Sequence, residues 1–134
     1  MNDIAPGSAQ PHLRMLIADD HEDAAELLAM LMREEGYSVD VAHDGRTALA
    51  IAQRERPDVV LLDIRMPGMD GNAVARNLRA SLPGARMLMV AVTGQGSPAE
   101  QVEARASGFD HHFTKPVDTN DLRACIANWS RSMA

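Results

Sequence analysis

The sequence has few cysteines, few aromatic residues and no long apolar run, and each shortage excludes a class of protein. The single cysteine, Cys125, cannot form a disulfide within the chain, which favours a reducing compartment, so we expect a cytoplasmic protein. No apolar run approaches the roughly 18 residues that a membrane-spanning helix needs, and the N-terminus lacks the apolar segment of a signal peptide. Aromatic residues make up only 3% of the chain, so its core must be largely aliphatic.

An excess of positive charge is also missing. The net charge is −6 at pH 7, whereas a nucleic-acid-binding domain normally presents a basic face. We therefore expect neither a nucleic-acid partner nor a membrane partner. The chain has 134 residues, of which 46% are hydrophobic and 24% charged, and this composition is typical of one globular domain.

Short apolar runs alternate with amphipathic stretches along the chain. Residues 1–12 show no periodicity and predict a flexible N-terminal arm, followed by a single domain over residues 13–131. The apolar runs predict strands at residues 13–18, 37–42, 58–63, 85–93 and 110–114. The amphipathic stretches predict helices at residues 22–36, 44–57, 71–84, 97–108 and 118–130. No predicted strand alternates polar and apolar residues, so we expect an α/β fold whose parallel sheet is covered by helices on both faces.

Local signals mark several helix ends and buried faces. Asp44 is expected to cap the second helix, and Ser97 with Glu100 forms a capping box at the start of the fourth. In the first helix one stripe is expected to be buried, formed by Ala24, Leu27, Leu28, Leu31 and Met32. In the last helix the expected buried face consists of Leu122, Cys125, Ile126 and Trp129.

Polar side chains gather where the predicted strands end. Asp19 and Asp20 follow the first strand, Asp63 ends the third, Thr93 ends the fourth and Lys115 follows the fifth. The carboxyl ends of parallel strands meet at one edge of a sheet, so these side chains are expected to share one pocket. Clustered carboxylates repel one another, and Mg²⁺ relieves that repulsion through the oxygen ligands it prefers. A carboxylate beside such an ion can attack phosphorus and form an aspartyl phosphate.

Four motifs in this order, "LIADD", "LLDIRMPGMDG", "VAVTG" and "FTKP", resemble those of the receiver domain of two-component response regulators. The resemblance covers about residues 14–130. It implies a flavodoxin-like, doubly wound (βα)5 fold with strand order 2-1-3-4-5. It also implies that Asp63 is the phosphoacceptor and that Asp19, Asp20, Asp63 and the backbone carbonyl of Arg65 hold Mg²⁺.

The remaining family positions carry the switch. The resemblance implies that Thr93 is the switch hydroxyl, that Lys115 binds the phosphoryl group and that the Lys115–Pro116 peptide bond is cis. His112 stands where receivers usually carry a rotating Tyr or Phe, and its ring could turn inward or face solvent. At the two positions that flank the phosphoryl group, the residues expected to tune its hydrolysis are Arg65 and Gln95.

The function implied by the resemblance is that of a phosphorylation-controlled switch, not an enzyme acting on a metabolite. Asp63 would take a phosphoryl group from a histidine kinase or a histidine phosphotransfer protein, and the fourth helix, fifth strand and fifth helix would present the output face to an unnamed partner. One alternative is a docking module that works without phosphorylation. Another, a Mg²⁺-dependent phosphohydrolase of the haloacid-dehalogenase type, is disfavoured because its nucleophile would follow the first strand and Arg65 stands where a second acid is needed. No DNA-binding or catalytic domain is expected after Ala134, and three possibilities stay open: a stand-alone regulator, a phosphorelay intermediate, or a receiver from a hybrid sensor kinase.

Overall fold

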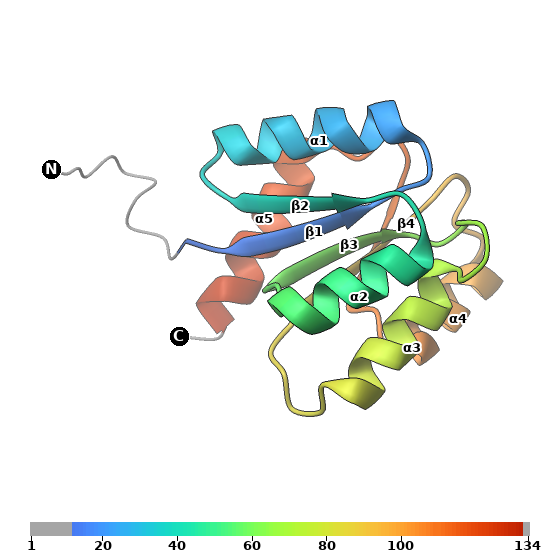
Figure 1. The fold of residues 1–134 in the computed structure, drawn as a ribbon. Coiled ribbons are helices and arrows are strands. Elements are labelled where there is room, and N and C mark those ends of the chain that lie inside the picture. The colour runs from blue at the N-terminus through green and yellow to red at the C-terminus, as the bar shows by residue number, and fades with distance from the viewer. Residues whose placement is uncertain (1–11, 133–134) are drawn as a thin grey trace, which may run out of the picture.

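The computed structural model of the chain describes residues 12–132, in which strands and helices alternate (Figure 1). The strands are β1 Arg14–Ala18, β2 Ser38–Ala42, β3 Val59–Asp63, β4 Leu88–Thr93 and β5 His111–Thr114. The helices are α1 Glu22–Glu34, α2 Gly45–Glu55, α3 Gly71–Ser81, α4 Pro98–Ser107 and α5 Thr119–Ser132. The N-terminal arm expected at residues 1–12 lies, apart from His12, outside the described residues. Among the helices described, none is long and apolar enough to cross a membrane.

The sheet has the predicted topology. Its strands run in the order β2-β1-β3-β4-β5, and every neighbouring pair is parallel. Strand β3 lies in the middle, paired with β1 on one side and β4 on the other. The doubly wound α/β fold and the strand order 2-1-3-4-5 are therefore confirmed.

Side chains on alternate residues of the central strands enter two different cores. In β1, Leu16 and Ala18 pack into the core that α2, α3 and α4 cover, whereas Met15 and Ile17 face the core beneath α1 and α5. Figure 1 shows these two helical layers on opposite faces of the sheet. Because both faces are covered, β1, β3 and β4 read as continuous apolar runs.

The two edge strands differ from the prediction. Their burial alternates or is only partial: Val39 and Ala42 are buried in β2 whereas Ser38 and Asp40 are exposed, and no residue of β5 is fully buried. The expectation that all strands would lack a polar side was wrong for these two. An edge strand has one neighbour only and is covered less completely by helices, so polar side chains there remain in water.

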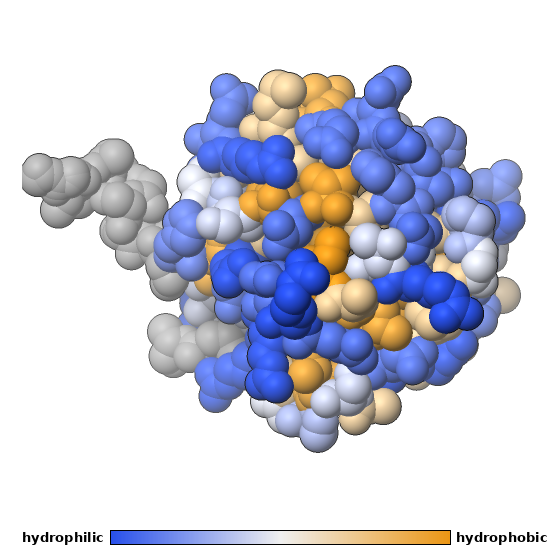
Figure 2. Space-filling model, viewed as in Figure 1, coloured by the Kyte–Doolittle hydropathy of each residue, from blue (hydrophilic) through white to orange (hydrophobic). Residues whose placement is uncertain are grey.

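Helix α1 buries only part of the predicted stripe: Met32 is buried and Leu28 partly buried, whereas Ala24, Leu27 and Leu31 are exposed. Its fully buried residues are Ala25, Ala29 and Met32, whereas Leu27 and Leu31 are 57% and 39% exposed. Small alanine side chains allow the helix to lie close to the sheet, and the leucines flank the contact instead of filling it. Hydrophobic residues consequently reach the surface over α1, at the top of the molecule in Figure 2.

The other local predictions agree with the structure. The Asp44 side chain accepts a hydrogen bond from the backbone N–H of Thr47, and Ser97 and Glu100 form the reciprocal capping box. In α5, Leu122 and Ile126 are buried, and the other two residues of the predicted face, Cys125 and Trp129, are partly buried against the same core.

Candidate functional site

The strand ends bring the predicted polar residues to one edge of the sheet. Asp63 is the last residue of β3, Thr93 is the last of β4, and Asp19 and Lys115 directly follow β1 and β5. The register aligns these ends, since Asp63 lies beside Val92 and Thr93 beside Thr114. The apolar strand interior thus fixes the position of each functional side chain through a rigid backbone.

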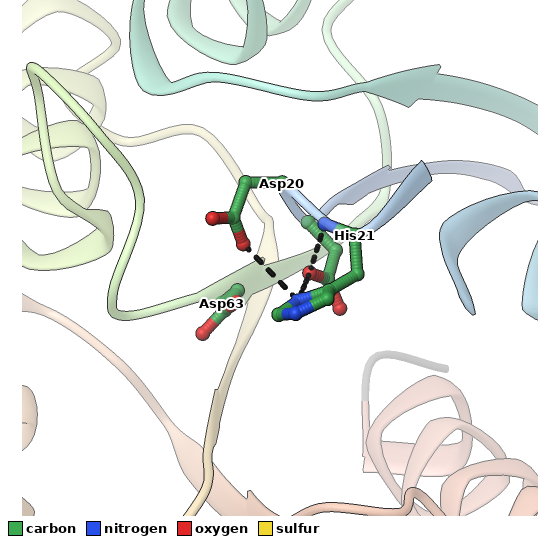
Figure 3. A group of neighbouring side chains, drawn as sticks. Asp20, His21 and Asp63 are labelled. Carbon is green, nitrogen blue, oxygen red and sulfur yellow. Dashed lines mark hydrogen bonds and ion pairs between the residues drawn. The ribbon is translucent and has the colours of Figure 1, made fainter. Parts of the chain in front are cut away.

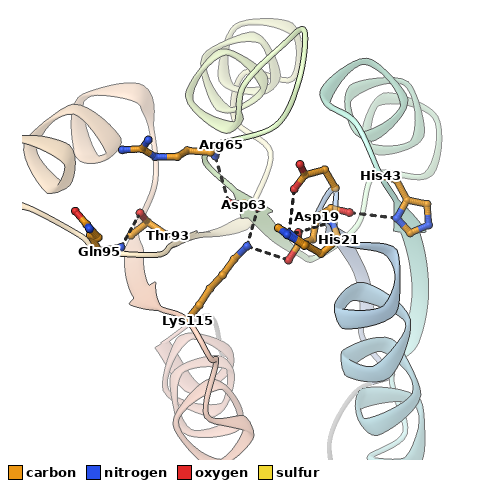
Figure 4. Close-up of polar contacts among 9 residues, drawn as sticks. Asp19, His21, His43, Asp63, Arg65, Thr93, Gln95 and Lys115 are labelled. Atoms are coloured by element: carbon orange, nitrogen blue, oxygen red, sulfur yellow. Dashed lines mark hydrogen bonds and ion pairs between the residues drawn. The ribbon is translucent and has the colours of Figure 1, made fainter.

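Lys115 joins two of the carboxylates. Its ammonium Nζ lies 2.8 Å from Asp63 Oδ2 and 3.3 Å from Asp19 Oδ2, as Figure 4 shows. Burial acts to lower the pKa of Lys115, but the hydrogen bond and charge of Asp63 and the charge of Asp19 outweigh it and raise that pKa. The lysine is therefore positively charged at neutral pH. The Lys115–Pro116 peptide bond is cis.

Asp63 is the most buried of the carboxylates. Only 4% of the residue is exposed, and its Oδ1 accepts a hydrogen bond of 3.2 Å from the backbone N–H of Arg65. Burial raises the pKa of Asp63, and the negative charge of Asp19 adds to this while Lys115 acts in the opposite direction. Asp63 thus has one neighbouring cation, Lys115, and one neighbouring anion, Asp19. Its negative charge is therefore not fully neutralised by the side chains around it.

Asp19 is stabilised in its charged form. Burial acts to raise its pKa, but the backbone N–H of His21, which donates to Asp19 Oδ1 at 2.9 Å, and the Lys115 ammonium together hold the pKa below its usual value. His43 was missed by the sequence argument. Its Nδ1 lies 3.1 Å from the Asp19 backbone carbonyl, so the β2–α2 loop contacts the loop that carries Asp19 after β1.

Four side chains at this edge offer a set of metal ligands. Ligand atoms of Asp19, Asp20, His21 and Asp63 all lie within 4.8 Å of one another. Figure 3 shows the imidazole of His21 between the acids, with Nδ1 3.4 Å from an oxygen of Asp19 and from one of Asp20. Three carboxylates are the hard oxygen donors that Mg²⁺ prefers, and the crowding of Asp63 is what such a cation would relieve. The residues present therefore fit a magnesium ion.

Thr93 at the end of β4 and the loop that follows it lie on the side of the site opposite Asp19. Thr93 is buried, and its hydroxyl accepts a hydrogen bond of 3.4 Å from the backbone N–H of Gln95. Gln95 itself is exposed. The switch hydroxyl predicted from the sequence thus lies at the sheet edge, tied to its own loop (Figure 4).

The Arg65 side chain points away from the carboxylates. Its guanidinium Nη2 donates to Glu100 Oε2 of α4 at 2.9 Å, and Figure 4 shows the side chain extending from the β3–α3 loop away from Asp63. The sequence predicts Glu100 only as a member of the capping box, and its ion pair with Arg65 was not predicted. The sequence holds no signal for it, because the two residues meet only when α4 folds beside that loop.

His112 lies partly buried beneath the β4–α4 loop, whereas its neighbour His111 is exposed. A β-carbon added to Gly96 would come within 2.5 Å of His112 Cε1, and Gly96 has φ +67, so only glycine suits this approach. The Nε2 atom of His112 is buried without a hydrogen-bond partner among the described residues. The ring is thus partly buried in this structure, and a switch role for His112 stays a prediction.

A groove opens beside the acidic cluster. It has a volume of about 460 Å³ and lies between α1 and the segment that joins β5 to α5. Asp19, Asp63 and Lys115 line one end, and the exposed Leu27 and Leu31 of α1 line the other. The groove therefore joins these three polar residues to a mostly apolar wall.

The pattern that defines the response regulator receiver domain matches residues 15–127 of the sequence. This match spans most of the chain and each of its motifs lies at the sheet edge, so the chain belongs to the response regulator receiver domain family. Members of the family accept phosphoryl groups from histidine kinases and act as switches rather than as enzymes with a metabolite substrate; they generally bind Mg²⁺ at an acidic cluster.

Individual relatives are response regulators from several bacteria. The chain is 37% identical over 118 residues to the response regulator PleD of Caulobacter vibrioides, covering 88% of this chain and 26% of PleD. It is 40% identical over 114 residues to the sensory transduction protein RegX3 of Mycolicibacterium smegmatis, covering 84% and 48%. The chain thus spans less than half the length of these relatives.

Solved structures show the same fold. A CheY-like response regulator receiver domain protein from Methanospirillum hungatei superimposes with a TM-score of 0.83 at 29% identity, over 91% of this chain and 96% of that one. The chemotaxis protein CheY4 of Vibrio cholerae gives 0.81 at 28% identity, over 88% and 98%. The fold is therefore shared over nearly the full length of each chain.

Proposed function

We propose that residues 13–131 form a phosphoacceptor domain in which Asp63 takes a phosphoryl group from a phosphohistidine, carried by a histidine kinase or a histidine phosphotransfer protein. The observation that carries this is the contact of 2.8 Å between Asp63 Oδ2 and Lys115 Nζ beside two further carboxylates. A structural ion pair would need only the lysine and one acid. A nucleophile that must accept a dianion needs an excess of cation-binding groups.

The transfer is a single displacement at phosphorus. A carboxylate oxygen of Asp63 forms the new phosphorus–oxygen bond while the phosphorus–nitrogen bond to the donor imidazole breaks, and its electron pair goes to the ring nitrogen. Lys115, charged in this pocket, pairs with the phosphoryl oxygens after transfer. Mg²⁺, held by Asp19, Asp20, Asp63 and the backbone carbonyl of Arg65, would supply positive charge that neutralises the phosphoryl oxygens.

The output is a rearrangement on the other side of the site. Thr93 exchanges its hydrogen bond with the Gln95 N–H for one with a phosphoryl oxygen, and the β4–α4 loop moves with it. His112 packs against Gly96 of that loop, so movement of the loop changes the space open to the imidazole. The surface of α4, β5 and α5 then binds a downstream protein, and Arg65 and Gln95 tune the lifetime of the acyl phosphate. We place this chemistry in the cytoplasm.

The test is labelling of the chain by acetyl phosphate and, separately, by autophosphorylated histidine kinases of the host. We expect labelling that requires Mg²⁺ and is prevented by a chelator added before the phosphoryl donor. Asp63→Asn abolishes it, whereas Asp40→Asn, which removes a carboxylate exposed on β2, leaves it unchanged. Equal labelling of the Asp63→Asn variant would overturn the proposal.

Two further measurements separate the alternatives. A phosphohydrolase would turn over p-nitrophenyl phosphate, whereas we expect no turnover beyond that of a blank. A phosphorylation-independent docking module would bind its partner equally well with and without acetyl phosphate, and partner binding by the Asp63→Asn variant would be unaffected.

A further inference from the structure

An ion pair that the proposed chemistry does not use links the loop after the phosphoacceptor to helix α4. Arg65 and Glu100 are 35 residues apart in the sequence and meet at 2.9 Å. The backbone N–H of Arg65 faces Asp63, but its guanidinium reaches across to α4 in the opposite direction (Figure 4). The same residue thus touches the phosphoacceptor with its backbone and is held away from it by its side chain.

Glu100 is anchored independently of Arg65. Its Oε1 accepts a hydrogen bond of 3.1 Å from the Ser97 N–H, and Ser97 Oγ in turn accepts one of 3.2 Å from the Glu100 N–H. The side chain of Glu100 is 22% exposed, whereas that of Arg65 is 76% exposed. The hydrogen bonds from Arg65 and from the Ser97 N–H hold the pKa of Glu100 below its usual value, so it is an anion at neutral pH. Glu100 is the fixed partner and Arg65 the movable one.

Released from Glu100, Arg65 has a second anion within reach. The guanidinium of a residue two positions from Asp63 can fold back over a phosphoryl group attached to that side chain. Guanidinium can pair with phosphoryl oxygens in two parallel hydrogen bonds, so Glu100 and a phosphoryl group on Asp63 would compete for Arg65. It would also cover the solvent side of the phosphorus.

We infer that Glu100 is a positioning residue that holds Arg65 away from the phosphoryl group on Asp63 and so keeps that group open to hydrolysis. The inference rests on the proposed function. In the hydrolysis, a water oxygen forms a bond to phosphorus, and the bond from phosphorus to the Asp63 oxygen breaks with its electron pair going to the carboxylate. The proton of the water leaves with the inorganic phosphate or passes to solvent. A guanidinium across the water's approach slows this step.

The expected effect is modest because the ion pair is exposed. Pairs of this kind bias an equilibrium by a few-fold at most, so loss of the pair should lengthen the half-life of the phosphorylated protein by about two- to fivefold. The bias also depends on salt, since exposed charges are screened.

The experiment is a double-mutant cycle on the rate of dephosphorylation. The chain is labelled with acetyl phosphate and Mg²⁺, the donor is removed, and the loss of label is followed for Glu100→Gln, Arg65→Met and the double variant. Glu103→Gln is the matched control, because it removes an exposed charge from the same helix without touching Arg65. We expect Glu100→Gln to slow the loss of label in the Arg65 background and to have no effect when Arg65 is Met.

The outcomes separate this inference from the proposed function. An unchanged or shorter half-life in Glu100→Gln, or an equal effect of Glu100→Gln with and without Arg65, would overturn the inference while leaving the phosphoacceptor role intact. An effect of Glu103→Gln as large as that of Glu100→Gln would overturn it too, since helix charge alone would then be the cause. Failure of acetyl phosphate and of every kinase to label the unsubstituted chain would overturn both.

Discussion

Strand β3 contains two neighbouring parts that are equally buried and chemically opposite. Val59, Val60, Leu61 and Leu62 are between 0% and 2% exposed and fill both cores, and Asp63, the next residue, is 4% exposed and carries a carboxyl group. Burying the four apolar side chains stabilises the fold, whereas burying the carboxylate costs free energy that Lys115 offsets only in part. The sheet interior therefore stabilises the fold, whereas the buried carboxylate at its carboxyl edge lowers the stability.

The largest effect is expected from removal of the cation beside Asp63. In Lys115→Met the phosphoryl oxygens lose the ammonium that lies 2.8 Å from Asp63, and we expect labelling by acetyl phosphate to slow by about 100-fold. Lys115→Arg keeps a positive charge there and should lose much less. Equal labelling rates for Lys115→Met and the wild type would mean that the ion pair is structural.

A cavity in the interior should have the largest effect on stability. Leu62→Ala removes a fully buried side chain immediately before Asp63, and we expect the free energy of unfolding in urea to fall by about 3 kcal/mol. The folded fraction of this variant should still be labelled. Leu27→Ala, at a position 57% exposed on α1, is the control and should change stability by less than about 0.5 kcal/mol.

Close packing behind the edge gives a smaller effect. A β-carbon on Gly45 would lie 1.9 Å from the backbone oxygen of Met69, in the loop that leads away from Asp63. We expect Gly45→Ala to lower the free energy of unfolding by about 2 kcal/mol, because backbone must shift to admit the methyl group. At Gly94 an added β-carbon meets nothing within 4 Å, so Gly94→Ala should leave thermal stability nearly unchanged.

Removing the negative charge of Asp63 should stabilise the protein slightly. Because burial raises the pKa of Asp63 above its ordinary value of 3.8, the charged form is disfavoured in the folded state. We expect Asp63→Asn to raise the free energy of unfolding by about 1 kcal/mol at neutral pH, measured in urea.

The stability gained by Asp63→Asn should depend on pH. A carboxyl group with a raised pKa in the folded state costs stability above that pKa and costs nothing once both states are protonated. The advantage of Asp63→Asn should therefore be present at neutral pH and shrink as pH falls through the folded pKa toward 3.8. An advantage that grows on acidification would show that Asp63 is instead stabilised as an anion.

Most of the fold could be predicted because the three central strands are covered on both faces. Short continuous apolar runs such as Val59–Leu62, bounded by turn residues, are typical of buried parallel strands, and cap signals such as Ser97 and Glu100 are local. The edge strands and the buried face of α1 were not predictable in the same way. The burial of Ala25 instead of Leu27 depends on how close the helix lies to the sheet, which the periodicity of α1 does not specify.

In the candidate site, too, one part could be predicted from the sequence and another part could not. Asp19, Asp63 and Lys115 could be placed together because parallel strands deliver their carboxyl ends to one edge. Contacts made by side chains across loops could not: Arg65 with Glu100, and His43 with the backbone of Asp19, follow from the packing of α4 and of the β2–α2 loop. Sequence motifs therefore predict which side chains meet at the strand ends better than they predict contacts across loops.

The central claim is that the carboxylate at the end of β3 is the group that receives the phosphoryl. The most direct measurement is to label the chain with acetyl phosphate and Mg²⁺, reduce the acyl phosphate with borohydride and locate the product by peptide mapping. We predict that the aspartate converted to homoserine is Asp63 and that no other aspartate is converted. Conversion at Asp19 or Asp20 instead, or label that survives borohydride as a phosphoester, would contradict the account.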